Sequence, residues 1–279
     1  MYSRPLTPLL GQSRFRYLAL LRIVLGHSVE RSEQLFRELK RKGFTEEQHA
    51  VHDAALGITV AFKFFWHMNA EHIKLLQRLP TLHPALGGRW PGALVLNTGL
   101  WHWMTPRLGA PDGFCTVLGG FMDQIVRETG ARGASNGAGG NGNGNTGSAL
   151  YWVSTTAIDE SRLSADRKDP IKGRQREVYM SNDLIYGMNE CARVVTGVGG
   201  GNALLQCRND GGAGSAAAPV SAVTAAGGGG ASGGRRWGYI DLFTSAMLRP
   251  DMLRGDGFHA GIELADIHVQ MILNDICPR

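Results

Sequence analysis

Two glycine-rich tracts limit how much of this chain can enter a folded core. The chain has 279 residues, and most of its 39 glycines fall within residues 130–148 and 196–234. Glycine loses more backbone entropy on folding than any other residue, and these tracts carry little apolar surface to offset that loss. We therefore expect two flexible, disordered insertions in one domain over residues 17–279, preceded by an N-terminal extension over residues 1–16. About 220 residues remain outside the tracts, a usual size for one α/β domain.

The rest of the chain alternates short apolar runs with amphipathic stretches. Apolar runs that end at a glycine or a polar residue are typical of buried strands, and apolar residues at a period of 3.6 indicate helices. The expected strands cover residues 17–25, 57–66, 92–96, 149–155 and 237–243. The expected helices cover residues 29–41, 67–79, 114–128, 176–195 and 262–276. This alternation predicts an α/β domain with a central, mainly parallel sheet covered by helices on both faces.

Charge and cysteine content exclude several classes of protein. The formal net charge is +5, and part of it lies in the basic segment 162–176, which suits either a solvated face or a site for an anionic substrate. No recognised nucleic-acid-binding motif is present, so no nucleic-acid partner is expected. The four cysteines include no C-x-x-C pair, so no metal is predicted, and the count is compatible with one or two disulfides.

No segment of the sequence has the features of a membrane span or a signal peptide. No apolar run reaches about 18 residues, the length that a membrane-spanning helix requires. The apolar segment 17–25 is interrupted by Arg22 and is followed by no clear small-residue cleavage site. We therefore expect neither a membrane span nor a signal peptide in this chain.

Three polar sites follow expected strands and so fall on one rim of the predicted sheet. Ser28 follows the first strand, Asn97 follows the third, and Asp256 and His259 stand between the last strand and the last helix. A serine becomes a nucleophile when a histidine removes its proton and a carboxylate orients that histidine. Asn97, the backbone N–H of Ser28 and Gly99 are candidates for holding the oxyanion. The alternatives are structural: Ser28 filling a turn, Asp256 capping a helix, and Asn97 bonding its own backbone.

The same residues resemble a known family. Gly26-x-Ser28-x-x-Arg31 resembles the G-D-S-x-x-R block of SGNH (GDSL-like) hydrolases. More narrowly, the chain resembles the catalytic domain of sialate O-acetyltransferases and fungal capsule polysaccharide O-acetyltransferases. The segments that carry this likeness are Phe64–His67, Tyr151–Val153, Leu163–Lys168, Asp256–His259 and Met271–Cys277. Leu94–Trp101 is closer to the N-T-G-x-W block of PC-esterase and trichome-birefringence-like proteins.

The resemblance implies an enzyme that moves acyl groups, acetyl above all, on and off sugar hydroxyls. It implies a three-layer α/β/α SGNH-hydrolase-like domain in which Ser28 is acylated, His259 is the base and Asp256 orients it. No bound cofactor is implied, and acetyl-CoA or another acyl donor would be a co-substrate. The implied partners are a carbohydrate or glycan substrate and a separate membrane-embedded acyltransferase, in the secretory pathway or the Golgi lumen.

Several other positions, and the function itself, allow more than one interpretation. His27 stands where the family has an aspartate, and with Arg31 it is expected to support the serine turn. Trp101 and Trp103 suit either a sugar-binding surface or the core. A carbohydrate acetylesterase of the same fold, a degenerate carbohydrate-binding domain and a basic surface protein that binds polyanions are the alternatives to the O-acetyltransferase.

Overall fold

The computed structural model of the chain describes residues 12–41, 48–63, 68, 74, 76–81, 84–88, 90–97, 111–129, 148–170, 179–197 and 237–277. Most of both glycine-rich tracts, and the segments 64–67 and 98–110, lie outside the described residues. At the edges of the tracts, Ser148 is buried and donates a hydrogen bond to the carbonyl oxygen of Pro91, and Thr196 ends a helix. The expected insertions therefore have no structural description beyond these edges.

The centre of the fold is a three-stranded parallel sheet. Its strands are β3 (Ala93–Leu96), β4 (Ala149–Val153) and β5 (Trp237–Ile240), in the order β3-β4-β5. The register pairs Leu96 with Trp152 and Trp152 with Tyr239. Strand β4 is central and buries Leu150, Trp152 and Val153, as a strand covered on both faces must. The predictions of these three strands and of their parallel arrangement are confirmed.

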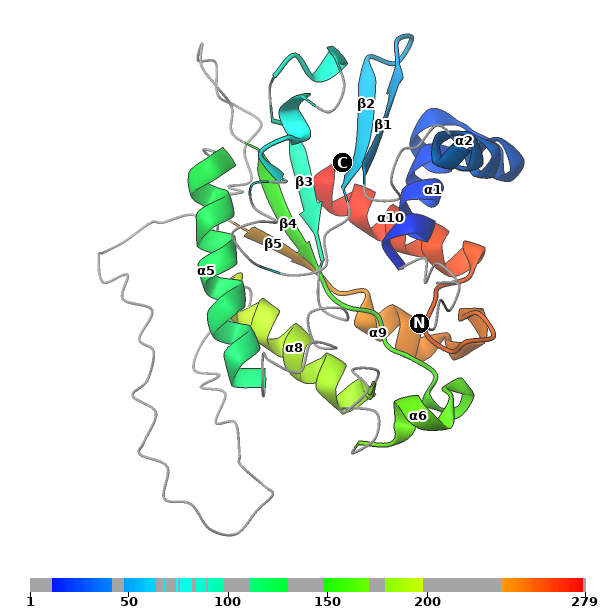
Figure 1. Ribbon diagram of the computed structural model, residues 1–279, viewed down its shortest axis with the longest axis vertical. Helices are drawn as coiled ribbons and strands as arrows, with labels where there is room; N and C mark the ends of the chain where they lie inside the picture. Colours follow the sequence, from blue (N-terminus) through cyan, green and yellow to red (C-terminus); the bar gives the residue numbers. More distant parts are fainter. Residues whose placement is uncertain are drawn as a thin grey trace, which may run out of the picture.

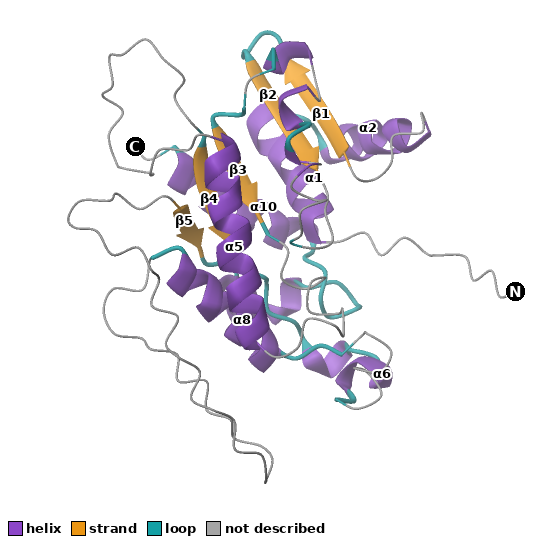
Figure 2. Cartoon of the chain, turned by 60° about the vertical axis from the view of Figure 1, so that its left-hand side comes forward, coloured by secondary structure: helices purple, strands orange, loops and turns teal. Residues whose placement is uncertain are grey.

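Helices flank both faces of this sheet (Figures 1 and 2). On one face, α5 (Pro111–Thr129) and α8 (Asn182–Val195) pack against the sheet around the fully buried ring of Trp152. On the other face, α10 (Ile262–Ile276) contributes Ile272 to a cluster with Val153 and Ile240. The chain is therefore a mixed α/β protein whose parallel sheet is covered by helices, as the alternating pattern predicts.

Shorter elements connect the sheet to these helices. After β4 come the 3-10 helix η4 (Glu160–Arg162) and α6 (Ala165–Lys168). After β5 come α9 (Phe243–Leu248) and the 3-10 helix η5 (Pro250–Met252), which lead into α10. Two further 3-10 turns, η1 (Leu79–Thr81) and η2 (Pro84–Leu86), precede β3.

The prediction of a strand over residues 17–25 is wrong. These residues belong to the helix α1 (Gln12–Leu25), which packs across α10 and leads into α2 (Val29–Arg41). Leu18, Ala19 and Leu21 are all buried, because α1 is covered by neighbours on most of its circumference. A helix of this kind has a continuous apolar run and cannot be told from a buried strand by periodicity.

The second expected strand exists, but outside the parallel sheet. Residues Ile58–Lys63 form β2, which pairs antiparallel with β1 (Gln48–Asp53) in a two-stranded sheet. The turn has a clear cause: Asp53 Oδ1 accepts hydrogen bonds from the N–H groups of Ala55 and Leu56, and Gly57 has a φ of 64°. A positive φ is readily adopted by glycine, so this segment folds back as a hairpin.

The expected helices agree with the structure to different degrees. Helices α2 and α10 have the predicted bounds, and α5 lies within three residues of its predicted bounds. The helix expected over 176–195 begins only at Asn182, because Ser181 accepts a hydrogen bond from the N–H of Leu184 and caps it. Only parts of the helix expected over 67–79 lie within the described residues.

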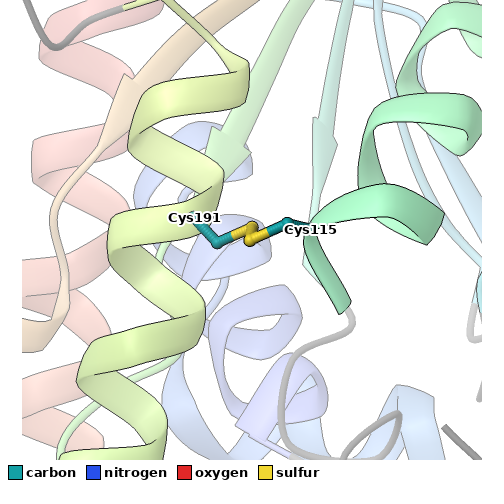
Figure 3. The surroundings of a disulfide bond; sticks show 2 residues. All are labelled: Cys115 and Cys191. Atoms are coloured by element: carbon teal, nitrogen blue, oxygen red, sulfur yellow. A yellow bond between two sulfur atoms is a disulfide. The ribbon is translucent and has the colours of Figure 1, made fainter. Parts of the chain in front are cut away.

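A disulfide joins the two helices on one face of the sheet. Cys115 of α5 is bonded to Cys191 of α8, at a sequence separation of 76 (Figure 3). Such a bond persists in an oxidising compartment and is rare in the reducing cytosol of most cells, so the disulfide is consistent with an oxidising setting. Across the described part of the chain, no helix is both long and apolar enough to cross a lipid bilayer.

Candidate functional site

Polar side chains gather where the parallel strands end. Asn97 follows β3, Ser154 and Thr155 follow β4, and Asp241 follows β5. Because parallel strands end on one rim, these residues lie where α/β proteins bind ligands. The prediction that Asn97 stands at the carboxyl end of a parallel strand is confirmed.

The Asn97 side chain ties two strands together. Its Nδ2 donates to the carbonyl oxygen of Val153 at 2.7 Å and approaches the Thr155 hydroxyl at 3.3 Å. Both hydrogens of the amide are therefore directed at β4 and the residues after it. In this structure Asn97 buttresses the rim, and to hold an oxyanion it would have to exchange one of these bonds for the substrate.

Several residues that complete the rim were not singled out in the sequence. Asn189 of α8 accepts from the N–H of Thr155 and donates to its carbonyl oxygen, both at 2.8 Å, so it replaces a strand partner. The Ser154 hydroxyl accepts from the N–H groups of Leu242 and Phe243. Thr156 is fully buried, and its hydroxyl has no hydrogen-bond partner among the described residues. The available signal was the run of three hydroxyl residues directly after an apolar strand.

The turn between η5 and α10 brings a carboxylate into contact with an imidazole. His259 Nδ1 lies 2.5 Å from Asp256 Oδ2, and the His259 side chain is only 8% exposed. The other carboxylate oxygen, Oδ1, accepts from the N–H groups of Phe258 and His259, both at 3.1 Å. One oxygen thus fixes the backbone of the turn while the other holds the imidazole. The sequence prediction that these two residues meet is confirmed.

Packing fixes this turn in place. Gly257 has a φ of 78°, and its carbonyl oxygen accepts from the N–H of Asp159. A Cβ at Gly257 would lie 2.6 Å from the carbonyl oxygen of Asp159, so the position is closed to any larger residue. The centroid of the Phe258 ring lies 4.1 Å from that of the His259 ring, with the two planes tilted by 41°, and the Arg167 guanidinium lies over the Phe258 ring, 4.4 Å from its centroid. These contacts hold the imidazole in one orientation.

The electrostatics of the turn favour a charged carboxylate. Partial burial acts to raise the pKa of Asp256, but the hydrogen bonds from the His259 ring and from two backbone N–H groups outweigh it. The pKa of Asp256 therefore lies below its ordinary value. An ionised Asp256 places the proton of neutral His259 on Nδ1, which leaves Nε2 as the basic nitrogen of the ring. A carboxylate and an imidazole in this arrangement have the chemistry that general-base catalysis requires.

Ser28 is held by a different element. Its Oγ accepts a hydrogen bond from the N–H of Arg31 at 3.0 Å, and its carbonyl oxygen accepts from Ser32 N, so it caps the N-terminus of α2. Within the described chain, the hydrogen bonds of Ser28 are local to α2. Figure 1 shows the α1–α2 connection in the upper part of the molecule and the segment between α9 and α10 in the lower part. The structure therefore does not bring Ser28 to His259.

The neighbours of Ser28 differ in their exposure. Gly26 has a φ of 66° and ends α1 in an open turn. His27 is half-buried, and its Nδ1 has no hydrogen-bond partner among the described residues. Arg31 is exposed on α2.

Gly99, Trp101 and Trp103 lie outside the described residues, so their predicted roles have no structural description.

A second buried histidine, His268, contacts a serine hydroxyl in the interior of the protein. His268 of α10 is fully buried, and its Nε2 is 2.9 Å from the hydroxyl of Ser245 in α9. Burial first, and the charge of Arg16 second, lower the pKa of His268 to about 3. A neutral, buried histidine of this kind joins two helices. The sequence signal was its position four residues after Leu264 and four before Ile272, on the apolar face of α10.

Comparisons with known proteins assign no family to this chain. No family model, no curated protein and no solved structure matches this chain. Among the described residues, no group of three or more histidine, cysteine or acidic side chains is placed to hold a metal ion.

Proposed function

We propose that this chain is an acyl-ester enzyme of SGNH type that acts on carbohydrate hydroxyls, with His259 as the general base and Asp256 as the residue that orients it. The observation that carries the proposal is the 2.5 Å contact between His259 Nδ1 and Asp256 Oδ2 in a packed turn, in which the imidazole is buried and the carboxylate is partly exposed. The parallel sheet flanked by helices supports it, because an SGNH domain has three layers of this kind. The resemblance of Asp256–His259 and Met271–Cys277 to the O-acetyltransferase domain supplies the substrate class.

Proton transfer is the step that the described residues explain. His259 Nε2 takes the proton of an attacking hydroxyl, and Asp256 stabilises the imidazolium that forms. Ser28 is the proposed attacking group: it forms an acyl-enzyme that a sugar hydroxyl resolves in a transferase and water resolves in an esterase. Because the α1–α2 connection and the turn before α10 lie apart in the structure (Figure 1), this route also requires a rearrangement that brings Ser28 to His259. The O-acetyltransferase is the first assignment and the acetylesterase the alternative.

The remaining assignments follow from the same resemblance. The acyl donor would be acetyl-CoA or another activated acyl group, and a membrane-embedded acyltransferase would be the partner. The setting would be the secretory pathway or the Golgi lumen, with which the Cys115–Cys191 disulfide is compatible. The basic residues near the turn, Arg162 and Arg167, would face the glycan.

One observation favours a second candidate, a non-catalytic carbohydrate-binding domain. His27 replaces the aspartate of the serine block, and its buried Nδ1 makes no hydrogen bond among the described residues. Nδ1 of His27 therefore does not make the hydrogen bonds that a carboxylate oxygen would make at this position. Together with the exposed, cap-bound Ser28, this favours a chain that keeps the base and has lost the nucleophile.

The deciding experiment combines acetate release from an acetylated glycan with labelling by a fluorophosphonate at pH 7–8. The wild-type chain should release acetate and be labelled, and both His259→Ala and Ser28→Ala should abolish both signals. Ser164→Ala is the matched control, because Ser164 is exposed, precedes α6 and makes no side-chain capping bond. Folded wild-type protein that gives neither signal but binds glycan would replace the enzyme with the binding domain. Loss of acetate release in His259→Ala but not in Ser28→Ala would remove Ser28 from the mechanism.

A further inference from the structure

A slot lies against the edges of two strands that belong to different sheets. It is a cavity of about 380 Å³, lined by residues 58–62 of β2 and by residues 91–97, which contain β3. The side chains of a strand alternate between its two faces, so a cavity over one face would contact every second residue. Because consecutive residues of both strands line this cavity, it follows the strand edges. β2 and β3 lie side by side in both overall views (Figures 1 and 2).

The edges along the slot carry main-chain groups without a strand partner. Among the described strands, β2 pairs only with β1 and β3 only with β4. The carbonyl oxygen of Gly92 accepts from the N–H of Ala149 in β4, and successive strand residues direct their main-chain groups to opposite edges. Ala93 and Val95 therefore direct their N–H and C=O groups away from β4. Within the described part of the chain, neither residue makes a main-chain hydrogen bond on that side.

The helices beside the slot favour aliphatic side chains on one face of an occupant. Leu20 and Val24 of α1 line the slot, as does α10 through Val269, Ile272, Leu273 and Ile276. Val95 at the open edge is 36% exposed, so solvent reaches this edge. Successive side chains of an added strand point to opposite faces. The slot therefore suits an extended segment that has an aliphatic residue at every second position.

We propose that the slot binds an extended peptide segment of another protein, which adds as a strand between β2 and β3. An unpaired strand edge is a template for a strand from another chain, and here two such edges line one cavity. Main-chain hydrogen bonds provide the affinity in this mode of recognition, and pockets for alternate side chains provide the specificity. The stretch 91–97 spans about 20 Å when extended, which sets the segment at about six residues.

This inference goes beyond the acyl-ester function and is independent of it. None of Ser28, Asp256 and His259 is among the residues that line the slot. A chain without esterase or transferase activity could therefore still bind the peptide, and an active enzyme could fail to bind it.

The first test compares two peptides that share the same side chains. The probe is a peptide of three valine–threonine pairs with a lysine at each end, and calorimetric titration of the full chain with it should give one saturable site. The same peptide N-methylated at alternate residues loses main-chain donors and should bind at least tenfold more weakly. Equal affinity for the two peptides, or no saturable binding of the first, would overturn the proposal.

Amide hydrogen exchange locates the added strand. The N–H of Val95 should exchange more slowly once the unmethylated peptide is bound, because it then donates to the peptide. A Val95 amide that is already fully protected in the free chain would show that the edge is occupied by this chain itself. Protection that rises with protein concentration would show that a second copy fills the slot. Either result would contradict the proposal.

Two pairs of variants test the slot directly. Val95→Pro removes the outward N–H at an edge position, where proline is tolerated, and should weaken peptide binding at least tenfold, whereas Val95→Ala keeps that N–H and should bind normally. Val24→Trp fills the slot from α1 and should block binding, whereas Ile23→Trp changes an exposed neighbour outside the lining and should not. If Val95→Pro fails to fold, the methylated peptide and the tryptophan pair decide. Normal binding by Val95→Pro, or an equal loss in the two tryptophan variants, would contradict the assignment.

Discussion

The turns that contain Ser28 and Asp256 have similar hydrogen bonding, but the polar residue has one side-chain oxygen in the first turn and two in the second. In each, a glycine with positive φ adjoins or lies near a polar residue whose side-chain oxygen accepts the N–H three positions later. The single side-chain oxygen of Ser28 accepts the hydrogen bond that caps α2. Asp256 has two, so it holds its own turn with Oδ1 and the His259 ring with Oδ2. Asp256 can therefore hold its own turn and the imidazole at the same time, whereas the single side-chain oxygen of Ser28 caps α2.

The largest expected effect is the loss of the base. His259→Ala should lower the acetate-release rate by about 10²–10⁴-fold, the range for removal of a general base. Asp256→Asn should lower it by a similar order while the turn survives, because an amide oxygen still accepts the N–H groups of Phe258 and His259. Steady-state kinetics at pH 8, with circular dichroism to check folding, measure both. An Asp256→Asn enzyme of full activity would show that the carboxylate is only a cap.

The two glycines sharpen the comparison of the turns. Gly26→Ala should cost about 1 kcal/mol, the strain of a left-handed residue, because no atom lies within 4 Å of the added Cβ. Gly257→Ala should cost about 3 kcal/mol, since overpacking adds to that strain where the Cβ meets the Asp159 carbonyl oxygen. Urea unfolding of both variants gives the difference. Equal costs would mean that the Asp256 turn is not packed against the segment that contains Asp159.

The buried His268 should make the stability of the folded chain depend on pH. The pKa of His268 is lowered to about 3, so the folded chain does not take up its proton between pH 6.5 and that value, whereas the unfolded chain does. Stability contributed by neutral His268 is complete above pH 6.5 and should fall by about 2 kcal/mol between pH 7 and pH 5. Asp256, whose pKa is lowered, titrates below this window. Unfolding free energies at several pH values should show this slope, and His268→Leu should remove it while the exposed His52→Asn keeps it.

The smallest expected effect concerns the cap itself. Ser28→Ala should destabilise the chain by about 1 kcal/mol, because it leaves the N–H of Arg31 without its side-chain acceptor. Ser164→Ala, which removes no capping bond, should stay within about 0.5 kcal/mol of the wild type. Thermal and urea unfolding measure both. No effect in Ser28→Ala would contradict the assignment of Ser28 as the cap of α2.

The sequence determined the sheet well and the serine poorly, for physical reasons. Strands β3, β4 and β5 were recognisable because each is a short apolar run that ends in a polar residue, and the Asp256–His259 contact is local, three residues apart. The run 17–25 was misread because a helix buried on most sides shows no amphipathic period. That error placed Ser28 on the sheet rim, and a serine–histidine approach across 231 residues depends on that placement. Asn189 was missed because its role depends on hydrogen bonds to the backbone of Thr155, 34 positions away in the sequence.

Long-range ¹H–¹⁵N NMR of the full chain at pH 7–8 reads the protonation of the His259 ring nitrogens and so decides whether this turn is a base. If it is, Nδ1 carries a proton that is shifted downfield by its bond to Asp256 and lost in Asp256→Ala, and Nε2 is unprotonated. A ring protonated on Nε2, or an Nδ1 signal that is the same in Asp256→Ala, would contradict the proposal that this turn is a base.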